Sequence, residues 1–231
     1  MPSELDNPIW SALVGPHSGF AAGHGLARHY PRTMAPFSAI AESSPQAYAD
    51  LASDLPSGVE ARLFRPVDEP SPAGWETLNS RPIVQMVMHD DAQMRTSTFD
   101  ELVSLDISDA EEMLQLAQLA KPGPFGPQTP KLGRYFGVRR NGQLVAMGGE
   151  RLHLSRFIEV SAICVHPNFR GAGLGTAILS QLASGILARG KAPFLHVFPD
   201  NPACDLYQHL GFRSSARLWV IWRRPIAKEV R

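Results

Sequence analysis

One segment, Val165–Thr176, constrains the fold more than any other part of the chain. Its sequence, VHPNFRGAGLGT, joins a strand expected at Phe157–Val165 to a helix expected at about 174–188. Glycines at a helix start let the backbone approach a ligand closely, and the helix dipole favours an anion there. Arg170 adds a forked cationic donor that suits phosphate. The segment therefore predicts a strand–loop–helix unit that cradles a pyrophosphate.

The order of the glycines separates this loop from two other phosphate loops. A P-loop requires Gly-Lys-Ser/Thr, whereas Gly175 is followed by Thr176 and an alanine. The dinucleotide fingerprint requires glycine at position 176, which is a threonine. The remaining pattern is Arg-x-x-Gly-x-Gly, formed by Arg170, Gly173 and Gly175. Alone it is a weak signal, because glycine-rich turns also occur by chance.

A second segment, residues 201–212, begins 26 residues after Gly175. Asn201 can cap a short helix, a proline suits its first position, and Gly211 suits a left-handed stop. Tyr207 lies one position beside the apolar stripe of this helix. We therefore expect its ring to look into a groove between two strands.

The remaining elements follow from periodicity and turn residues. Ser108 and Glu111 predict a capping box for a helix that ends near Lys121, and Asn141-Gly142 predicts a hairpin turn. Ser44 predicts the cap of a helix in the first part of the chain. We expect strands at Val59–Phe64, Ile83–Met88, Phe99–Leu105, Tyr135–Arg139, Leu144–Leu152, Phe157–Val165, Phe194–Phe198 and Leu218–Trp222.

The two motifs, in this order and spacing, resemble the GNAT superfamily of acetyl-CoA-dependent N-acetyltransferases. The resemblance covers about residues 98–231 and implies an α+β (α/β) fold with a central mixed, mostly antiparallel sheet flanked by helices. Residues 1–97 do not match the family core, and we expect an N-terminal accessory α+β region of unknown role. Within the superfamily, the chain most resembles the branch that acts on small molecules and amino acids and that includes glycine N-acyltransferase relatives.

The resemblance implies a donor site for acetyl-CoA. Backbone amides from Gly171 to Thr176 would hold the pyrophosphate, and the pantetheine arm would follow the Phe157–Val165 strand where it splays from its neighbour. A backbone N–H near Cys164 or Val165 would then face the thioester oxygen. The residues expected to contact the donor are Ile163, Cys164, Val165, Arg170, Gly171, Ala172, Gly173, Leu174, Gly175, Thr176, Asn201 and Tyr207.

The implied reaction is acetyl transfer to a primary amine of a small molecule or peptide, by direct attack through a tetrahedral intermediate. Glu159 is the candidate base, because some family members carry their catalytic glutamate there. Strand alternation would place it on one face with Ser161 and Ile163. Its alternative is an ion pair with Arg156 or Arg151, and Glu150 is a second candidate base.

Tyr207 is the candidate acid for the leaving thiolate, and its alternative is packing within the helix. Cys164 and Cys204 are expected to be structural, and His166 and His196 to flank the cleft. The Pro122–Pro130 loop occupies the place where family members line the acceptor pocket. The early histidines lack metal-ligand spacing, so we expect no metal site.

The distribution of charge also divides the chain into two parts. The formal net charge is zero, but residues 1–97 hold 6 basic against 11 acidic residues and residues 98–231 hold 16 against 11. A basic module suits a polyanionic donor. We expect no nucleic-acid or membrane partner and a cytoplasmic location, because the chain lacks a strong basic excess, a long apolar run and a signal-peptide pattern. The alternatives to an enzyme are a non-catalytic CoA-binding regulatory module and, less favoured by the loop pattern, a nucleotide-binding module.

Overall fold

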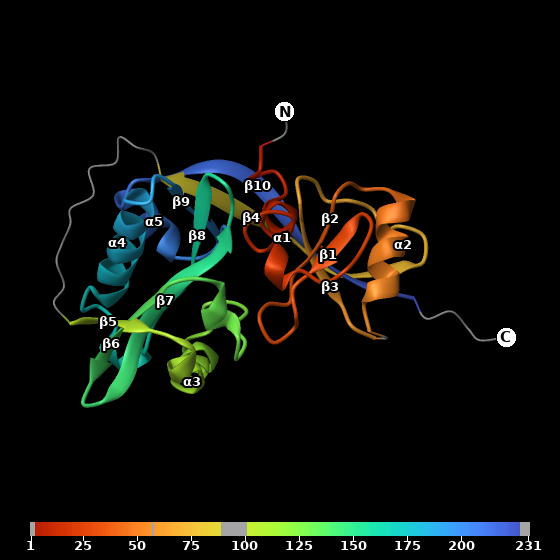
Figure 1. Cartoon of the computed structure of the whole chain (residues 1–231). Coiled ribbons are helices and arrows are strands. Elements are labelled where there is room, and N and C mark those ends of the chain that lie inside the picture. Colours follow the sequence, from red (N-terminus) through yellow and green to blue (C-terminus); the bar gives the residue numbers. More distant parts are fainter. Residues whose placement is uncertain (1–2, 57, 89–100, 227–231) are drawn as a thin grey trace.

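The computed structural model describes residues 3–56, 58–88 and 101–226, and within them an eight-stranded sheet forms the centre of the molecule (Figure 1). Among the neighbouring strands of this sheet, as far as the structure describes it, only β8 and β9 pair in parallel; the other neighbours are antiparallel. This confirms the expected mixed, mostly antiparallel sheet. In spatial order the strands are β3 (Ala61–Arg65), β10 (Phe212–Pro225), β4 (Trp75–Met88), β9 (Ala192–Val197), β8 (Phe157–Val165), β7 (Gln143–His153), β6 (Tyr135–Arg140) and β5 (Leu102–Leu105).

Helices cover both faces of the β7–β8 part of the sheet. On one face α4 (Leu174–Leu187) buries Ile178 and Leu182 against a core that includes Val160. On the other face α3 (Ala110–Ala120) buries Met113 and Leu116 in a core that includes Cys164. The short α5 (Ala203–His209) packs beside β10. Helices therefore cover this part of the sheet on both faces.

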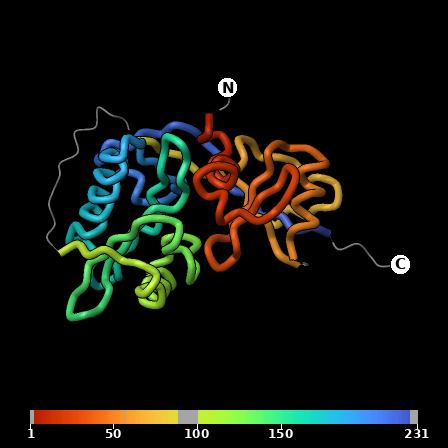
Figure 2. The backbone as a smooth tube through the Cα atoms, in the orientation of Figure 1, coloured from red at the N-terminus to blue at the C-terminus, as the bar shows by residue number. Residues whose placement is uncertain are grey.

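The first part of the chain forms a smaller layer beside the sheet. It contains α1 (Pro8–Leu13), β1 (Ala27–His29), β2 (Ser38–Ile40) and α2 (Pro45–Asp54), with β1 and β2 paired as a separate two-stranded sheet. The long strands β4 and β10 run from this layer into the main body (Figure 2). Strands β3 and β4 thus extend the same sheet as the strands after residue 97. The division at residue 97 falls outside the described residues and stays a prediction.

Local signals placed most elements, although α1, β1 and β2 have no counterpart among the expected elements. The Ser44 side chain accepts the Ala47 N–H at 3.3 Å, as expected for the α2 cap, and Asn141 and Gly142 adopt the positive φ angles of the expected hairpin turn. The capping box, however, is formed by Asp106 and Asp109 and not by Ser108 and Glu111, because the two aspartates bond a short 3-10 turn ahead of α3.

Two strands are also much longer than expected. Strand β4 begins at Trp75 and not at Ile83, and β10 begins at Phe212 and not at Leu218. Pro82 is tolerated within β4 because the strand pairs there with β10, while its pairing with β9 covers only Val84–Val87. The start of the strand expected at Phe99 lies outside the described residues, and β5 begins at Leu102.

Candidate active site

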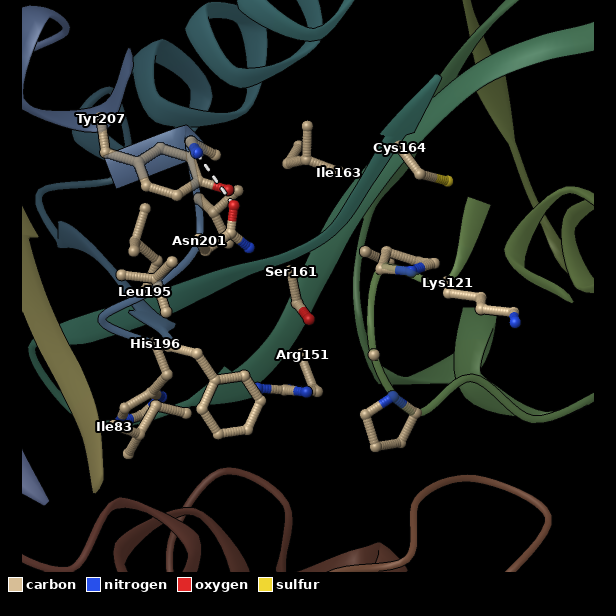
Figure 3. A pocket seen from close by; sticks show the side chains of 18 of the residues that line it. Ile83, Lys121, Arg151, Ser161, Ile163, Cys164, Leu195, His196, Asn201 and Tyr207 are labelled. Carbon is tan, nitrogen blue, oxygen red and sulfur yellow. Dashed lines mark hydrogen bonds between the residues drawn. The ribbon is translucent and has the colours of Figure 1, made fainter. Parts of the chain in front are cut away.

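The two central strands separate halfway along their length and open a cavity. Parallel pairing of β8 with β9 ends at Glu159 opposite Phe194, so the following residues of the two strands are unpaired with each other. A cavity of about 470 Å³ lies in the opening, with Ser161 near its middle (Figure 3). The expected splay of this strand is confirmed. Because both strands expose backbone here, the opening can accept an extended ligand.

A β-bulge in β8 shapes this opening. Between the pairs Met147–Cys164 and Gly149–Ser161, β8 has two residues where β7 has only Gly148, and Ala162 takes a left-handed φ of 55°. The bulge turns Ile163 toward the α4 side of the sheet, where it packs against the core. The expectation that Ile163 shares a face with Glu159 is therefore wrong, because simple alternation fails across a bulge.

The glycine loop lies at one end of the cavity. Gly171 and Gly173 have φ angles of 80° and 74°, which favour glycine, and α4 starts directly after Gly173. The cavity brings together seven of the residues expected at the donor site, namely Ile163, Cys164, Val165, Arg170, Gly175, Asn201 and Tyr207. Five expected residues do not line it: Gly171, Ala172, Gly173, Leu174 and Thr176. Leu174 is instead buried in the core beneath the helix.

Tyr207 and Asn201 reach the same end from the second motif (Figure 3). The Asn201 side chain accepts the Ala203 N–H at 2.9 Å, which fixes the start of α5. Burial, with a smaller contribution from Cys204, raises the pKa of the Tyr207 hydroxyl. The phenol therefore keeps its proton at neutral pH and can donate it.

Glu159 lies fully buried beside the cavity. Its carboxylate accepts hydrogen bonds from Arg151 Nε at 2.8 Å and Nη2 at 2.6 Å, and His196 Nδ1 lies 2.6 Å from it. Burial alone would raise the pKa of Glu159, but Arg151 and His196 outweigh it and lower the pKa to about 2. The ion pair with Arg151, the alternative considered for this residue, is present. The role of base stays a prediction, and these surroundings weigh against it because such a carboxylate accepts protons poorly.

The second candidate base is also held in an ion pair. Glu150 is buried, bonds Arg189 and lies 3.0 Å from His153 Nε2. Its pKa is lowered to about 2, since these partners outweigh the effect of burial. It does not line the cavity. Both candidate carboxylates are thus held in buried ion pairs.

The opposite end of the cavity contains residues without a sequence motif. His196 contacts Phe64 with ring centroids 4.7 Å apart, and its Nε2 lies 3.1 Å from the Gln85 side-chain nitrogen. Phe37 and Arg62 line the same cavity. Sequence reasoning missed Phe37, Arg62 and Phe64, because only contacts between distant segments bring them here.

The loop after α3 forms a side wall of the cavity. Lys121, Pro122, Gly123 and Pro124 line it, in agreement with the expected position of this loop. Phe125 instead packs against Tyr135, with ring centroids 6.0 Å apart. Within the described residues there is no cluster of side chains that could hold a metal ion, and no helix long and apolar enough to span a membrane.

Comparison with known structures places this architecture in a family. A GNAT-family protein from Novosphingobium aromaticivorans DSM 12444 is similar over 97% of this chain and 99% of its own, at 33% identity and a TM-score of 0.87. The chain belongs to the GNAT family of acetyltransferases. The FR47-like protein family model also matches it, over residues 135–220. No curated protein matches the chain.

More distant GNAT structures share the fold over nearly the whole chain. A GCN5-related N-acetyltransferase from Kribbella flavida has a TM-score of 0.62 at 15% identity, covering 95% of each chain. A GCN5-related N-acetyltransferase-like protein from Streptococcus suis 89/1591 has a TM-score of 0.60 at 16% identity, covering 94% of this chain and 92% of its own. The likeness includes the first part of the chain, so the smaller layer is also part of this GNAT architecture.

Proposed function

We propose that this GNAT protein transfers an acetyl group from acetyl-CoA to a primary amine of a small molecule or peptide, by direct attack through a tetrahedral intermediate. The observation that carries the proposal is the cavity between the separated strands β8 and β9, with the glycine loop at one end and a wall of side chains at the other. Donor and acceptor would meet near Ser161, in the middle of this opening.

The residues of the glycine loop fit the donor. The left-handed glycines Gly171 and Gly173 precede the first turn of α4, whose free N–H groups and dipole favour a pyrophosphate. Arg170 is exposed beside them and forms none of the ion pairs found among the described residues. The apolar side chains of Ile163 and Val165 would lie along the pantetheine arm.

The separation of β8 from β9 supports the proposed stabilisation of the intermediate. Beyond Glu159, β8 no longer pairs with β9, so a backbone N–H near Cys164 or Val165 can point into the opening. One such donor, aimed at a developing oxyanion, typically contributes about 3 kcal/mol to lowering the barrier.

Proton transfer is assigned to Tyr207 and to solvent. Tyr207 would protonate the leaving thiolate, since its raised pKa keeps the phenol protonated until that step. Glu159, expected as the base, is assigned instead to holding Arg151 and His196 in the cavity wall. The acceptor amine would lose its proton to water at the mouth of the cavity before it attacks.

The test is a thiol-release assay with acetyl-CoA across a panel of primary amines, paired with calorimetric titration of CoA. Amine-dependent thiol release together with CoA binding supports the proposal. Binding without release for any amine would favour a non-catalytic CoA-binding module, and no CoA binding would exclude both.

Cys164 and Cys204 are free thiols, which fits the expected cytoplasmic location.

A further inference from the structure

The cavity end farthest from the glycine loop is built largely by the first part of the chain. Phe64 on β3 lies opposite Val220, and Arg62 lies opposite Trp222, in the β3–β10 ladder. The Phe37 backbone forms an isolated β-bridge with Arg62, and the ring centroids of Phe37 and Phe64 lie 5.4 Å apart. These contacts place Phe37, Phe64 and Trp222 around one end of the cavity, which we call the aromatic subsite.

The subsite is joined to the rest of the cavity through His196 and Arg151. Phe64 packs against His196, and the Arg151 guanidinium lies 4.8 Å from the Phe37 ring centre. In the view of Figure 3, Tyr207 lies above Ser161, and His196 and Arg151 lie below it. The subsite is therefore where the body of an acceptor would lie if its amine is near Ser161.

The charges around the subsite oppose a second ammonium group. Among the described residues that line the cavity there is no aspartate or glutamate, whereas Arg62 and Arg151 both line it. Their carboxylate partners, Glu60 at 2.7 Å and Glu159 at 2.6 Å, do not line the cavity. A dicationic acceptor would lose water here and gain no anionic partner.

We propose that the aromatic subsite selects the acceptor: an amine with an aromatic or branched apolar side group and no second positive charge. The proposal rests on the proposed acetyl transfer and gives residues 1–97 a role in it, since they supply Phe37, Arg62 and Phe64. Trp222 is its most accessible aromatic ring, because it is half-buried while Phe37 and Phe64 are 4% and 3% exposed. Aromatic side chains combine a large apolar contact area with little loss of conformational freedom.

A matched pair of tryptophans on β10 provides the test. Trp222 lies under Arg62, with the guanidinium carbon 5.8 Å from the ring centre, and Trp219 lies under Arg217 at 6.0 Å. Both rings are half-buried, but only Trp222 lines the cavity. Trp222→Leu and Trp219→Leu therefore remove equivalent surface stacks, one inside the subsite and one outside it.

The experiment compares phenethylamine, 3-methylbutylamine and 1,4-diaminobutane in thiol release, and measures phenethylamine binding by calorimetry without turnover. We expect kcat/KM for phenethylamine to exceed that for 1,4-diaminobutane by about 10-fold or more. Trp222→Leu should raise the Kd and the KM for phenethylamine by about 5- to 20-fold. The KM for acetyl-CoA should stay unchanged, and Trp219→Leu should resemble the unmodified protein.

Two outcomes would overturn the subsite. One is a preference for the diamine, and the other is an equal effect of both tryptophan substitutions. Phenethylamine that binds with the expected Trp222 dependence but releases no thiol, with no amine active, would instead overturn the proposed acetyl transfer and leave the subsite in place.

Discussion

Arg151 and Glu159 lie on the neighbouring strands β7 and β8 and are joined by two hydrogen bonds, of 2.8 and 2.6 Å. The pair is almost completely buried, with the arginine side chain 9% exposed and the glutamate 0%. Glu159 is the last residue of β8 that pairs with β9, so the ion pair lies where the two strands separate. Glu159 stands at the position where some family members carry their catalytic glutamate, and here it neutralises an arginine of the cavity wall.

Glu159→Gln is expected to lower stability because it leaves the Arg151 charge buried without its counter-charge. The expected loss in the free energy of unfolding is about 3 kcal/mol, measured by urea denaturation. Glu76→Gln, in an exposed pair with Arg224, is the control and should change stability by less than about 1 kcal/mol. If Glu159 only positions Arg151 and His196, the acid limb of the pH–rate profile should persist in the variant. Loss of that limb would restore Glu159 as the base.

Stability is expected to fall in acid in two stages. The pKa of His17 is lowered to about 4, mainly by burial, so the unfolded chain binds its proton first. Stability from His17 is therefore present above pH 6.5 and lost as pH falls to about 4, by up to about 3 kcal/mol. Glu150 and Glu159, with pKa values lowered to about 2, add a second loss below about pH 4.5.

His17→Asn separates these two stages, since the amide does not titrate. The melting temperature of the variant should vary less between pH 6.5 and 4 than that of the unmodified protein. The decline below pH 4 should remain, because it comes from the two glutamates. A curve parallel to that of the unmodified protein over the upper range would rule out His17 as its source.

Gly148→Ala is expected to disturb the bulge opposite it. A Cβ at Gly148 would overlap the Ile163 side chain and lie 2.8 Å from Ile178 Cγ2. Overpacking of this kind costs about 1–3 kcal/mol, which thermal denaturation can measure. Gly185→Ala is the control, because its Cβ would meet nothing within 4 Å in a helix and should be neutral or stabilising. Equal effects of the two substitutions would contradict close packing at Gly148.

Gly173→Ala is expected to weaken acetyl-CoA binding in calorimetry, because φ is 74° at the start of α4 and alanine strains that conformation by about 1–2 kcal/mol. Gly190→Ala carries the same kind of strain, at φ 69°, beyond the other end of the helix. Both should lower stability similarly, but only Gly173→Ala should lower the affinity for the donor. Unchanged affinity in both variants would argue against a donor site at this loop.

Tyr207→Phe is expected to slow thiol release by about 100-fold while leaving the KM for acetyl-CoA nearly unchanged. Tyr135→Phe is a suitable control, since the buried Tyr135 hydroxyl has no hydrogen-bond partner among the described residues and does not line the cavity. That control should retain both activity and stability. A Tyr207→Phe enzyme with the turnover and pH profile of the unmodified protein would return Tyr207 to a packing role.

Short-range patterns were sufficient for most elements of this protein. The Ser44 cap, the Asn141-Gly142 turn and the glycine loop before α4 depend on residues that are neighbours in the chain, so the sequence predicted their conformations. Hydrophobic alternation predicted the central strands but not the extra residue at Ala162. That bulge depends on the space left by Gly148 on the adjacent strand.

The sequence by itself determined a strand–glycine loop–helix unit, a second helix that carries Tyr207, and a likeness to one family. Only the tertiary structure decided that Glu159 is paired with Arg151, since strand pairing and burial set the pKa of a carboxyl group. It also brought Phe37 and Phe64 into the wall of a cavity whose other side is formed more than 90 residues later by β8. No local pattern records such a contact, because its free energy comes from apolar surfaces that meet only when the sheet is complete.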